Sequence, residues 1–154
     1  MLINMDNHKA LNMLFQFISL FGTPIFYTPV IIYLGYINLN FTIKLIVIII
    51  LTEILGGAIK ILYPKERPMP MKNKTIIQKY RAGSFPSIHS ARITALSAGL
   101  ATLYSNKLFI VIMILLVISV GYSRIYLKKH YAIDVIGGYI IGAIISIIGL
   151  NIWD

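Results

Sequence analysis

The sequence contains no cysteine, which excludes disulfide bonds, thiol catalysis and cysteine-ligated metal centres. Acidic residues are also scarce, because five Asp and Glu stand against fourteen Lys and Arg, giving a net charge of +9. The first nine residues have no basic start before an apolar run, and no small-residue cleavage site follows them. A cleavable signal peptide is therefore not expected.

What the chain has in abundance is hydrophobic sequence: 58% of its residues are hydrophobic and only 12% are charged. Uncharged stretches of roughly 20 residues, enough to cross a bilayer, recur along it. We therefore expect an all-α, polytopic helix bundle in the cell membrane, with residues 1–154 forming one domain. Nucleic acid is not an expected partner because no soluble domain exists to carry a basic face. The oligomeric state stays open.

Five membrane spans are expected, and the first is the least regular. It lies between residues 10 and 43, where Gly22-Thr23-Pro24 predicts a kink, or a sixth span if the segment is split there. Residues 64–85 are hydrophilic and rich in proline, which predicts a loop. The remaining spans are expected at Phe41–Tyr63, Ile88–Tyr104, Leu108–Tyr122 and Ala132–Trp153.

Two features inside these spans predict contacts between helices. Glu53 is a carboxylate within the second span, and we expect it to hydrogen-bond to a neighbouring helix. Gly137, Gly138 and Gly142 place small residues along the last span, which favours close helix packing.

The basic residues are concentrated in two stretches: Lys60–Arg92 and Arg124–Lys129 hold eleven of the fourteen. The loop after the second span lies on one side of the membrane, and two crossings later the chain returns to that side near Ser123. The two basic stretches are therefore expected to be neighbours, so that their polar residues converge.

The converging residues are two imidazoles, a carboxylate, a hydroxyl and three cations. His130 and Asp134 stand four apart, so on a helix they would share one face, and the carboxylate could fix the histidine tautomer. The first stretch brings the spacings K-x6-R-P and P-S-x-H. The full set is Lys60, Arg67, Ser87, His89, Arg124, His130 and Asp134.

A metal site and an anion site compete for these residues. His89, His130 and Asp134 are plausible zinc or iron ligands. Three nearby cations would repel a metal ion and attract an anion, and arginine matches phosphate with bidentate geometry. A helix starting after Ser87 would add backbone N–H donors. We therefore expect a phosphate site with no metal and no cofactor.

The spacings resemble the three signature motifs of the type-2 phosphatidic acid phosphatase superfamily, which groups integral-membrane lipid phosphatases with glucose-6-phosphatase and soluble haloperoxidases. The resemblance covers roughly residues 60–143. The chain departs from the family pattern in having isoleucine where glycine is usual, and five expected spans where six are usual. The matching motifs are Lys60-x6-Arg67-Pro68, Pro86-Ser87-Ile88-His89 and Ser123-Arg124-x5-His130-x3-Asp134.

The resemblance implies a two-step hydrolysis, which we expect to be metal-independent because the cationic side chains supply the charge that a metal ion would. His130 would attack phosphorus to give a phosphohistidine, with Asp134 holding its other nitrogen, and His89 would protonate the leaving oxygen and then activate water. The remaining site residues would bind the phosphate, through charge, a hydroxyl or a backbone N–H: Lys60, Arg67, Arg124, Ser87 and Ile88.

The substrate implied is a lipid phosphate or diphosphate in the bilayer. We expect a polyprenyl diphosphate, because little of the chain lies outside the membrane to read an elaborate headgroup. Phosphatidic acid and phosphatidylglycerophosphate are the alternatives. A non-catalytic module that binds anionic lipid, or a small transporter, is the alternative from another class. The second phosphate would meet basic loop residues: Lys65, Lys72, Lys74, Lys79 and Arg81.

The side of the membrane that the site faces stays open. Eight basic residues of the active face are not needed for chemistry, against Lys44 and Lys107 on the opposite face, which favours the cytoplasm. The family resemblance favours the outer side.

Overall fold

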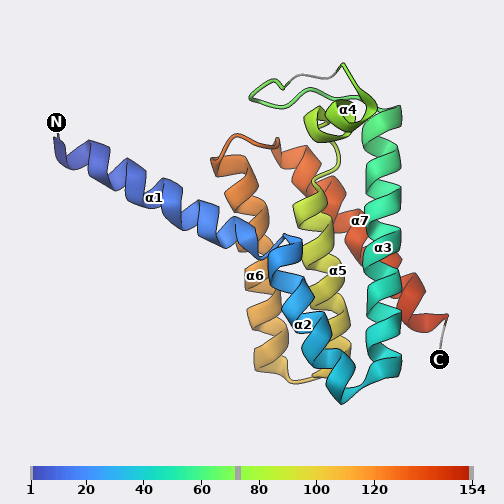
Figure 1. The fold of residues 1–154 in the computed structure, drawn as a ribbon. Coiled ribbons are helices and arrows are strands. Elements are labelled where there is room, and N and C mark those ends of the chain that lie inside the picture. The colour runs from blue at the N-terminus through green and yellow to red at the C-terminus, as the bar shows by residue number, and fades with distance from the viewer. Residues whose placement is uncertain (1, 72–73, 153–154) are drawn as a thin grey trace.

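The structure, a computed structural model, describes residues 2–71 and 74–152 and forms a bundle of α-helices (Figure 1). No strand occurs within these ranges. The helices are α1 (Leu2–Leu20), α2 (Pro24–Ile37), α3 (Leu39–Leu62), α4 (Ile76–Ala82), α5 (Ile88–Leu103), α6 (Lys107–Tyr126) and α7 (Ala132–Asn151).

Four helical stretches are long and apolar enough to cross a bilayer: His8–Ile37, Leu39–Leu62, Lys107–Tyr126 and Ala132–Asn151. The shorter α5 runs among them and contacts α3, α6 and α7. Because these helices pack around α5, Ser90 and Ser97 are buried in it, and Arg92 and Thr94 are half-buried. The expected all-α, multi-pass membrane bundle is confirmed, and five crossings fit it.

The N-terminal segment is divided at the expected place, between α1 and α2 at Phe21–Thr23. The 14 residues of α2 give a length of about 21 Å, which is shorter than a hydrocarbon core of about 30 Å. Figure 1 shows α1 running out from the bundle, and Phe15 near its end packs on Tyr122 and Tyr126 of α6. Together α1 and α2 form one apolar stretch, His8–Ile37, that is long enough for one crossing.

One helix end and one whole helix differ from the sequence prediction. Helix α6 continues to Tyr126 rather than ending at Tyr122, because Ser123 and Arg124 are buried and extend the helical turn. The loop after α3 contains the short helix α4, which the prediction missed. Its start is fixed by a capping box between Thr75 and Gln78. The predicted end of the last span at Trp153 lies outside the described residues.

The close approach of α5 and α7 confirms the prediction from the glycines. A Cβ atom on Gly138 would lie 2.4 Å from the carbonyl oxygen of Ser87, and one on Gly142 would lie 2.4 Å from that of Ala91. Any side chain at these two positions would therefore push the helices apart. This contact brings the start of α5 against the start of α7.

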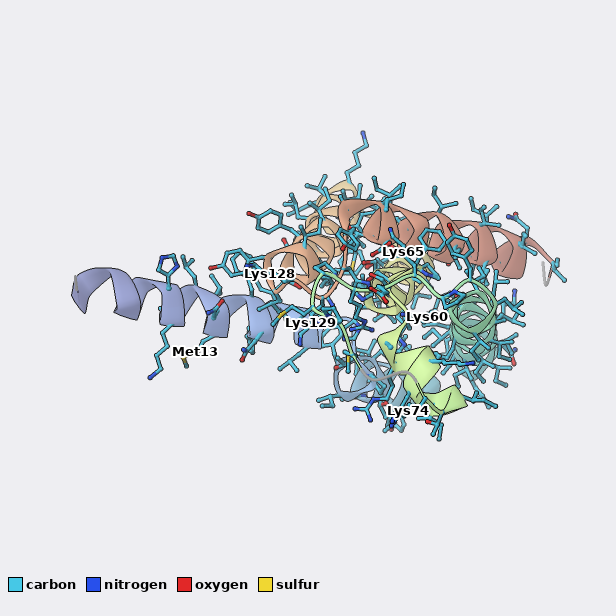
Figure 2. All side chains as sticks on the ribbon, turned by 90° about the horizontal axis from the view of Figure 1, so that it is seen from above. Met13, Lys60, Lys65, Lys74, Lys128 and Lys129 are labelled. Atoms are coloured by element: carbon cyan, nitrogen blue, oxygen red, sulfur yellow. The ribbon has the colours of Figure 1, made fainter. Side chains whose placement is uncertain are left out.

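The two basic stretches meet at one end of the bundle, as the crossing count predicted. In the view from above, Lys60, Lys65 and Lys129 lie over the helix ends, whereas Lys74 lies at the edge beside α4 (Figure 2). The loop and α4 cover this end (Figure 1).

Candidate active site

His130 is buried in the turn between α6 and α7 and lines a cavity of about 320 Å³. Its Nδ1 lies 2.7 Å from the backbone carbonyl oxygen of Ser84. Because a carbonyl only accepts, Nδ1 carries the proton and Nε2 keeps its lone pair. Burial lowers the pKa of His130 to about 4, so the ring is neutral at pH 7. The turn therefore presents a neutral nitrogen with a free lone pair.

His130 and Asp134 do not share a helical face, so that part of the sequence prediction is wrong. Helix α7 begins at Ala132, and His130 lies in the turn that precedes it. The turn closes because Lys128 adopts a positive φ of 53° and the His130 N–H donates to the Arg124 carbonyl at 3.2 Å. His130 Nδ1 and Asp134 Oδ2 are nevertheless 3.8 Å apart.

Asp134 organises the residues on either side of His130. Its Oδ2 accepts from the Ser84 hydroxyl and, at 2.8 Å, from the Tyr131 N–H. Its Oδ1 lies 2.6 Å from Lys65 Nζ. At 3.8 Å the carboxylate is too far from Nδ1 for a direct hydrogen bond, so it holds the ring mainly through Ser84, whose own carbonyl receives Nδ1–H.

Six cationic side chains line the cavity together with both histidines. Three of them were expected from the sequence, and the other three come from α4, α5 and the turn before His130. They are Lys60, Arg67, Arg124, Arg81, Arg92 and Lys129. No carboxylate is among the described residues that line the cavity. The cavity therefore carries a strong positive potential suited to an anion.

The three cations expected to bind phosphate are held in place by hydrogen bonds to other parts of the chain. Lys60 is buried and donates to the Gly83 carbonyl at 2.5 Å, while Arg67 Nη2 reaches the same oxygen at 3.4 Å. Arg124 donates to the hydroxyl of Ser19 on α1. The Nε atoms of Arg67 and Arg124 are buried and have no hydrogen-bond partner among the described residues. Buried donors of this kind call for an acceptor, and an oxyanion in the cavity would supply one.

Ser87 and Ile88 occupy the start of α5 but differ in their surroundings. The Ser87 hydroxyl caps α5, accepting from the Ser90 hydroxyl at 2.9 Å, and the residue is not among those lining the cavity. Ile88 does line it and sits in ordinary helical backbone. Its side chain occupies space left by Gly56 of α3, where a Cβ would lie 2.4 Å from Ile88 Cδ1. A glycine on α3 therefore makes room for the isoleucine.

His89 lines the cavity from the first turn of α5, and the corner between α1 and α2 packs against its backbone. A Cβ on Gly22 would lie 2.9 Å from His89 Cβ and 3.0 Å from the His89 carbonyl oxygen. The N-terminal segment thus contacts the site twice, at His89 through Gly22 and at Arg124 through Ser19.

Sequence reasoning missed two residues that shape the site, Ser84 and Gly83, and gave Lys65 a different role. The Ser84 backbone carbonyl contacts His130, and the Gly83 carbonyl accepts from Lys60. Lys65 forms an ion pair with Asp134. No motif marks them, since Ser84 and Gly83 only precede the P-S-x-H element by a few residues. Within the described ranges, no group of three His, Asp or Glu side chains is placed to hold a metal ion.

The chain is similar in sequence and in fold to known proteins. The chain is 29% identical over 155 residues to an undecaprenyl-diphosphatase of Sulfolobus acidocaldarius, covering 98% of this chain and 75% of that protein. Its fold is similar to the crystal structure of Aquifex aeolicus LpxE, with a TM-score of 0.78 and 28% identity over 97% of this chain and 90% of the other.

A second solved structure shows likeness of fold alone. It is a PAP2-type phosphatidylglycerolphosphate phosphatase from Bacillus subtilis, with a TM-score of 0.76 and 21% identity over 93% of this chain and 76% of the other. Residues 41–154 match the family model of the PAP2 superfamily, and this match includes every residue of the cationic cavity. The chain therefore belongs to the PAP2 superfamily.

Proposed function

We propose that the protein is a membrane lipid phosphatase that works through a phosphohistidine, with a polyprenyl diphosphate as its preferred substrate. The observation that carries this proposal is the orientation of His130. Its Nδ1 is held by the Ser84 carbonyl, which directs the Nε2 lone pair toward a cavity lined by six cations. Binding an anionic lipid needs the cations but does not need a neutral nucleophile.

The proposed reaction has two displacements at phosphorus. Nε2 of His130 forms a bond to phosphorus, the bond to the leaving oxygen breaks, and the imidazolium form of His89 gives that oxygen a proton and becomes neutral. Neutral His89 then takes a proton from water, which attacks the phosphohistidine and releases phosphate. Lys60, Arg67 and Arg124 stabilise the charge on the phosphoryl oxygens in both steps.

The positive charge that a metal ion would otherwise supply comes from these side chains, so we propose metal-independent catalysis. The Ser87 hydroxyl, which caps α5, has at most a supporting role. The backbone of Ile88 lies at the first turn of α5, where N–H groups have no partner within the helix and can face an anion.

A polyprenyl diphosphate is favoured by the small polar region. Outside the helices that cross the membrane, the described chain contributes mainly the loop after α3, which holds α4. An undecaprenyl-diphosphatase is also among the relatives. Phosphatidic acid and phosphatidylglycerophosphate remain the competing substrates.

The test is phosphate release by the purified chain from a polyprenyl diphosphate, a phosphatidic acid and a phosphatidylglycerophosphate, each with and without excess EDTA. We expect the highest kcat/KM with the diphosphate, no effect of EDTA, and inhibition by vanadate, which mimics five-coordinate phosphorus. Preference for a monoester would replace the polyprenyl assignment. Loss of activity on chelation, restored by added metal, would overturn metal independence. No release from any lipid would favour the non-catalytic, lipid-binding alternative.

The contact between Gly22 and His89 makes a separate prediction. Gly22→Ala should lower kcat by about 10- to 100-fold, because the new methyl group displaces His89 and small displacements of a catalytic group are costly. Gly35→Ala in α2 is the matched control, since its nearest neighbour would lie at an ordinary 3.7 Å. Steady-state kinetics on both variants, with thermal melting to confirm folding, tests this. Full activity in Gly22→Ala would mean that the corner does not position His89.

A further inference from the structure

Arg92 is a cation in the cavity that neither the family motifs nor the proposed chemistry uses. It lines the cavity from α5, and its Nε and Nη2 lie 2.7 and 2.6 Å from Oε2 of Glu53 on α3. The predicted bond of Glu53 to a neighbouring helix is thus confirmed. The other carboxylate oxygen accepts from the hydroxyl of Tyr80 on α4. Burial raises the pKa of Tyr80 to about 12, so this hydroxyl stays protonated and donates.

The way Arg92 is held leaves part of it for a ligand. The guanidinium group has five N–H donors in a planar fork, and Glu53 takes only the edge formed by Nε and Nη2. The side chain is 14% exposed and the residue lines the cavity, so the N–H donors that Glu53 does not take are available to a ligand there. Glu53 therefore fixes the direction of the fork and balances a charge that would be costly to leave unpaired within the membrane.

The position of Arg92 relative to His89 gives it a specific place along a substrate. The two residues are three apart in α5 and share one face of it. Because α5 starts at the loop end of the bundle and runs away from it (Figure 1), Arg92 lies about 4.5 Å deeper than His89. Arg81 and Lys129 are exposed and lie at the loop end of the bundle, on α4 and in the turn before α7.

A lipid diphosphate would lie along this direction. The phosphorus that is attacked is the terminal one, next to His130, and the bridging oxygen that leaves is next to His89. When that P–O bond breaks, its electron pair stays on the bridging oxygen, and a lipid monophosphate departs. The phosphate of that product carries the tail, which must reach the bilayer, so it lies beyond His89 on the side where Arg92 stands.

We propose that Arg92, oriented by Glu53, binds the second phosphate of a diphosphate substrate and thereby sets the preference for diphosphates over monoesters. This rests on the proposed phosphatase function. It replaces the expectation that basic loop residues hold that phosphate. Lys65 pairs with Asp134 instead, Lys79 lines a different cavity, and Lys74 lies at the edge of the bundle. Arg81 does line the cationic cavity, but it is exposed and belongs to α4 at the loop end. Lys72 lies outside the described residues.

The test uses a pair of ligands that the enzyme cannot hydrolyse: methylenediphosphonate and methylphosphonate. Their affinities for the purified full chain are measured by calorimetry. The variant Arg92→Gln/Glu53→Gln removes both charges and keeps a hydrogen-bonding pair, so no unpaired charge is left in the membrane. We expect it to bind methylenediphosphonate about 10- to 100-fold more weakly, the effect of one charge-assisted hydrogen bond, and methylphosphonate less than about threefold more weakly.

Two further variants sharpen this result. Arg81→Gln removes a charge at the exposed loop end and should weaken both ligands by the same small factor. Arg92→Lys keeps the charge and loses the fork, and it should show the selective loss even if the double variant does not fold. Equal loss for both ligands, or no loss for either, in the folded Arg92 variants would overturn the proposal.

Kinetics then separate this proposal from the one on which it rests. In the double variant, kcat/KM for a polyprenyl diphosphate should fall at least tenfold more than for the monophosphate with the same tail. Binding of the phosphonates requires no turnover. A wild-type chain that releases phosphate from no lipid would therefore contradict the phosphatase function, while the calorimetry would still decide the role of Arg92.

Discussion

Replacing His130 by asparagine is expected to lower kcat by at least about 10⁴-fold while leaving the fold intact, because the substitution removes only the nucleophile. The amide nitrogen of the introduced asparagine can stand in for Nδ1 and donate to the Ser84 carbonyl, which His130 contacts at 2.7 Å. Nothing then occupies the position of Nε2. Phosphate release measured with excess enzyme should reveal this loss, and more than a few per cent of wild-type activity would refute the nucleophile assignment.

The chain offers a matched control, because its three histidines differ in their surroundings. His8 lies exposed on α1, far from the cavity, so His8→Asn should have wild-type activity. After an alkaline quench, a lipid diphosphate labelled in the terminal phosphate should leave label on the wild-type protein. His130→Asn should carry no label. His89→Asn should carry more than wild type, because a phosphate leaving group needs little protonation, whereas hydrolysis of the intermediate needs the base.

The convergence of the site residues was predictable because it depends on two robust properties of the sequence. The apolar runs are long enough to fix how often the chain crosses the membrane, and the spacings place Lys60, Arg67, His89, Arg124 and His130 at the ends of those runs. All five line one cavity. Counting crossings needs no knowledge of side-chain packing, which is why it succeeded.

The local arrangement around His130 was not predictable, because it depends on backbone carbonyls and turns. A four-residue spacing suggested one helical face, but a positive φ at Lys128 ends the helix before His130. The direct partner of the ring is the Ser84 carbonyl, and every residue has a carbonyl. Only the folded loop selects which one meets the imidazole. No spacing rule could have singled out Ser84.

The pairing of Ile88 with Gly56 illustrates the same limit. Ile88 stands where the family usually has glycine. In the structure its side chain fills space that the absent side chain of Gly56 leaves free on α3. The compensating residue lies on α3, two helices earlier in the chain than α5. A single sequence without its fold gives no reason to connect the two positions.

Asp134→Asn is expected to be the second most damaging substitution, lowering kcat on the order of 10²- to 10⁴-fold, in the range known for carboxylates that orient a catalytic histidine. Asparagine keeps one acceptor oxygen but has no charge, so Lys65 loses its ion pair. The amide oxygen would also accept the hydrogen bonds from Ser84 and Tyr131 more weakly than the carboxylate oxygen does. KM should change much less than kcat, since Asp134 is not among the residues that line the cavity. Equal changes in both would indicate a general loss of structure.

The route from Asp134 to His130 can be tested by a double-mutant cycle. Ser84→Ala removes the hydroxyl that donates to Asp134 but keeps the carbonyl that receives Nδ1–H, so alone it should cost less than Asp134→Asn. If Asp134 positions the ring through Ser84, adding Ser84→Ala to Asp134→Asn should cause almost no further loss. The variant Asp134→Asn/Lys65→Gln tests whether the loss in Asp134→Asn comes only from leaving the Lys65 ammonium group unpaired. We expect this double variant to be as inactive as Asp134→Asn. Additive losses for Ser84 and Asp134, or recovery when Lys65 is also replaced, would show that the carboxylate serves the ion pair rather than the nucleophile.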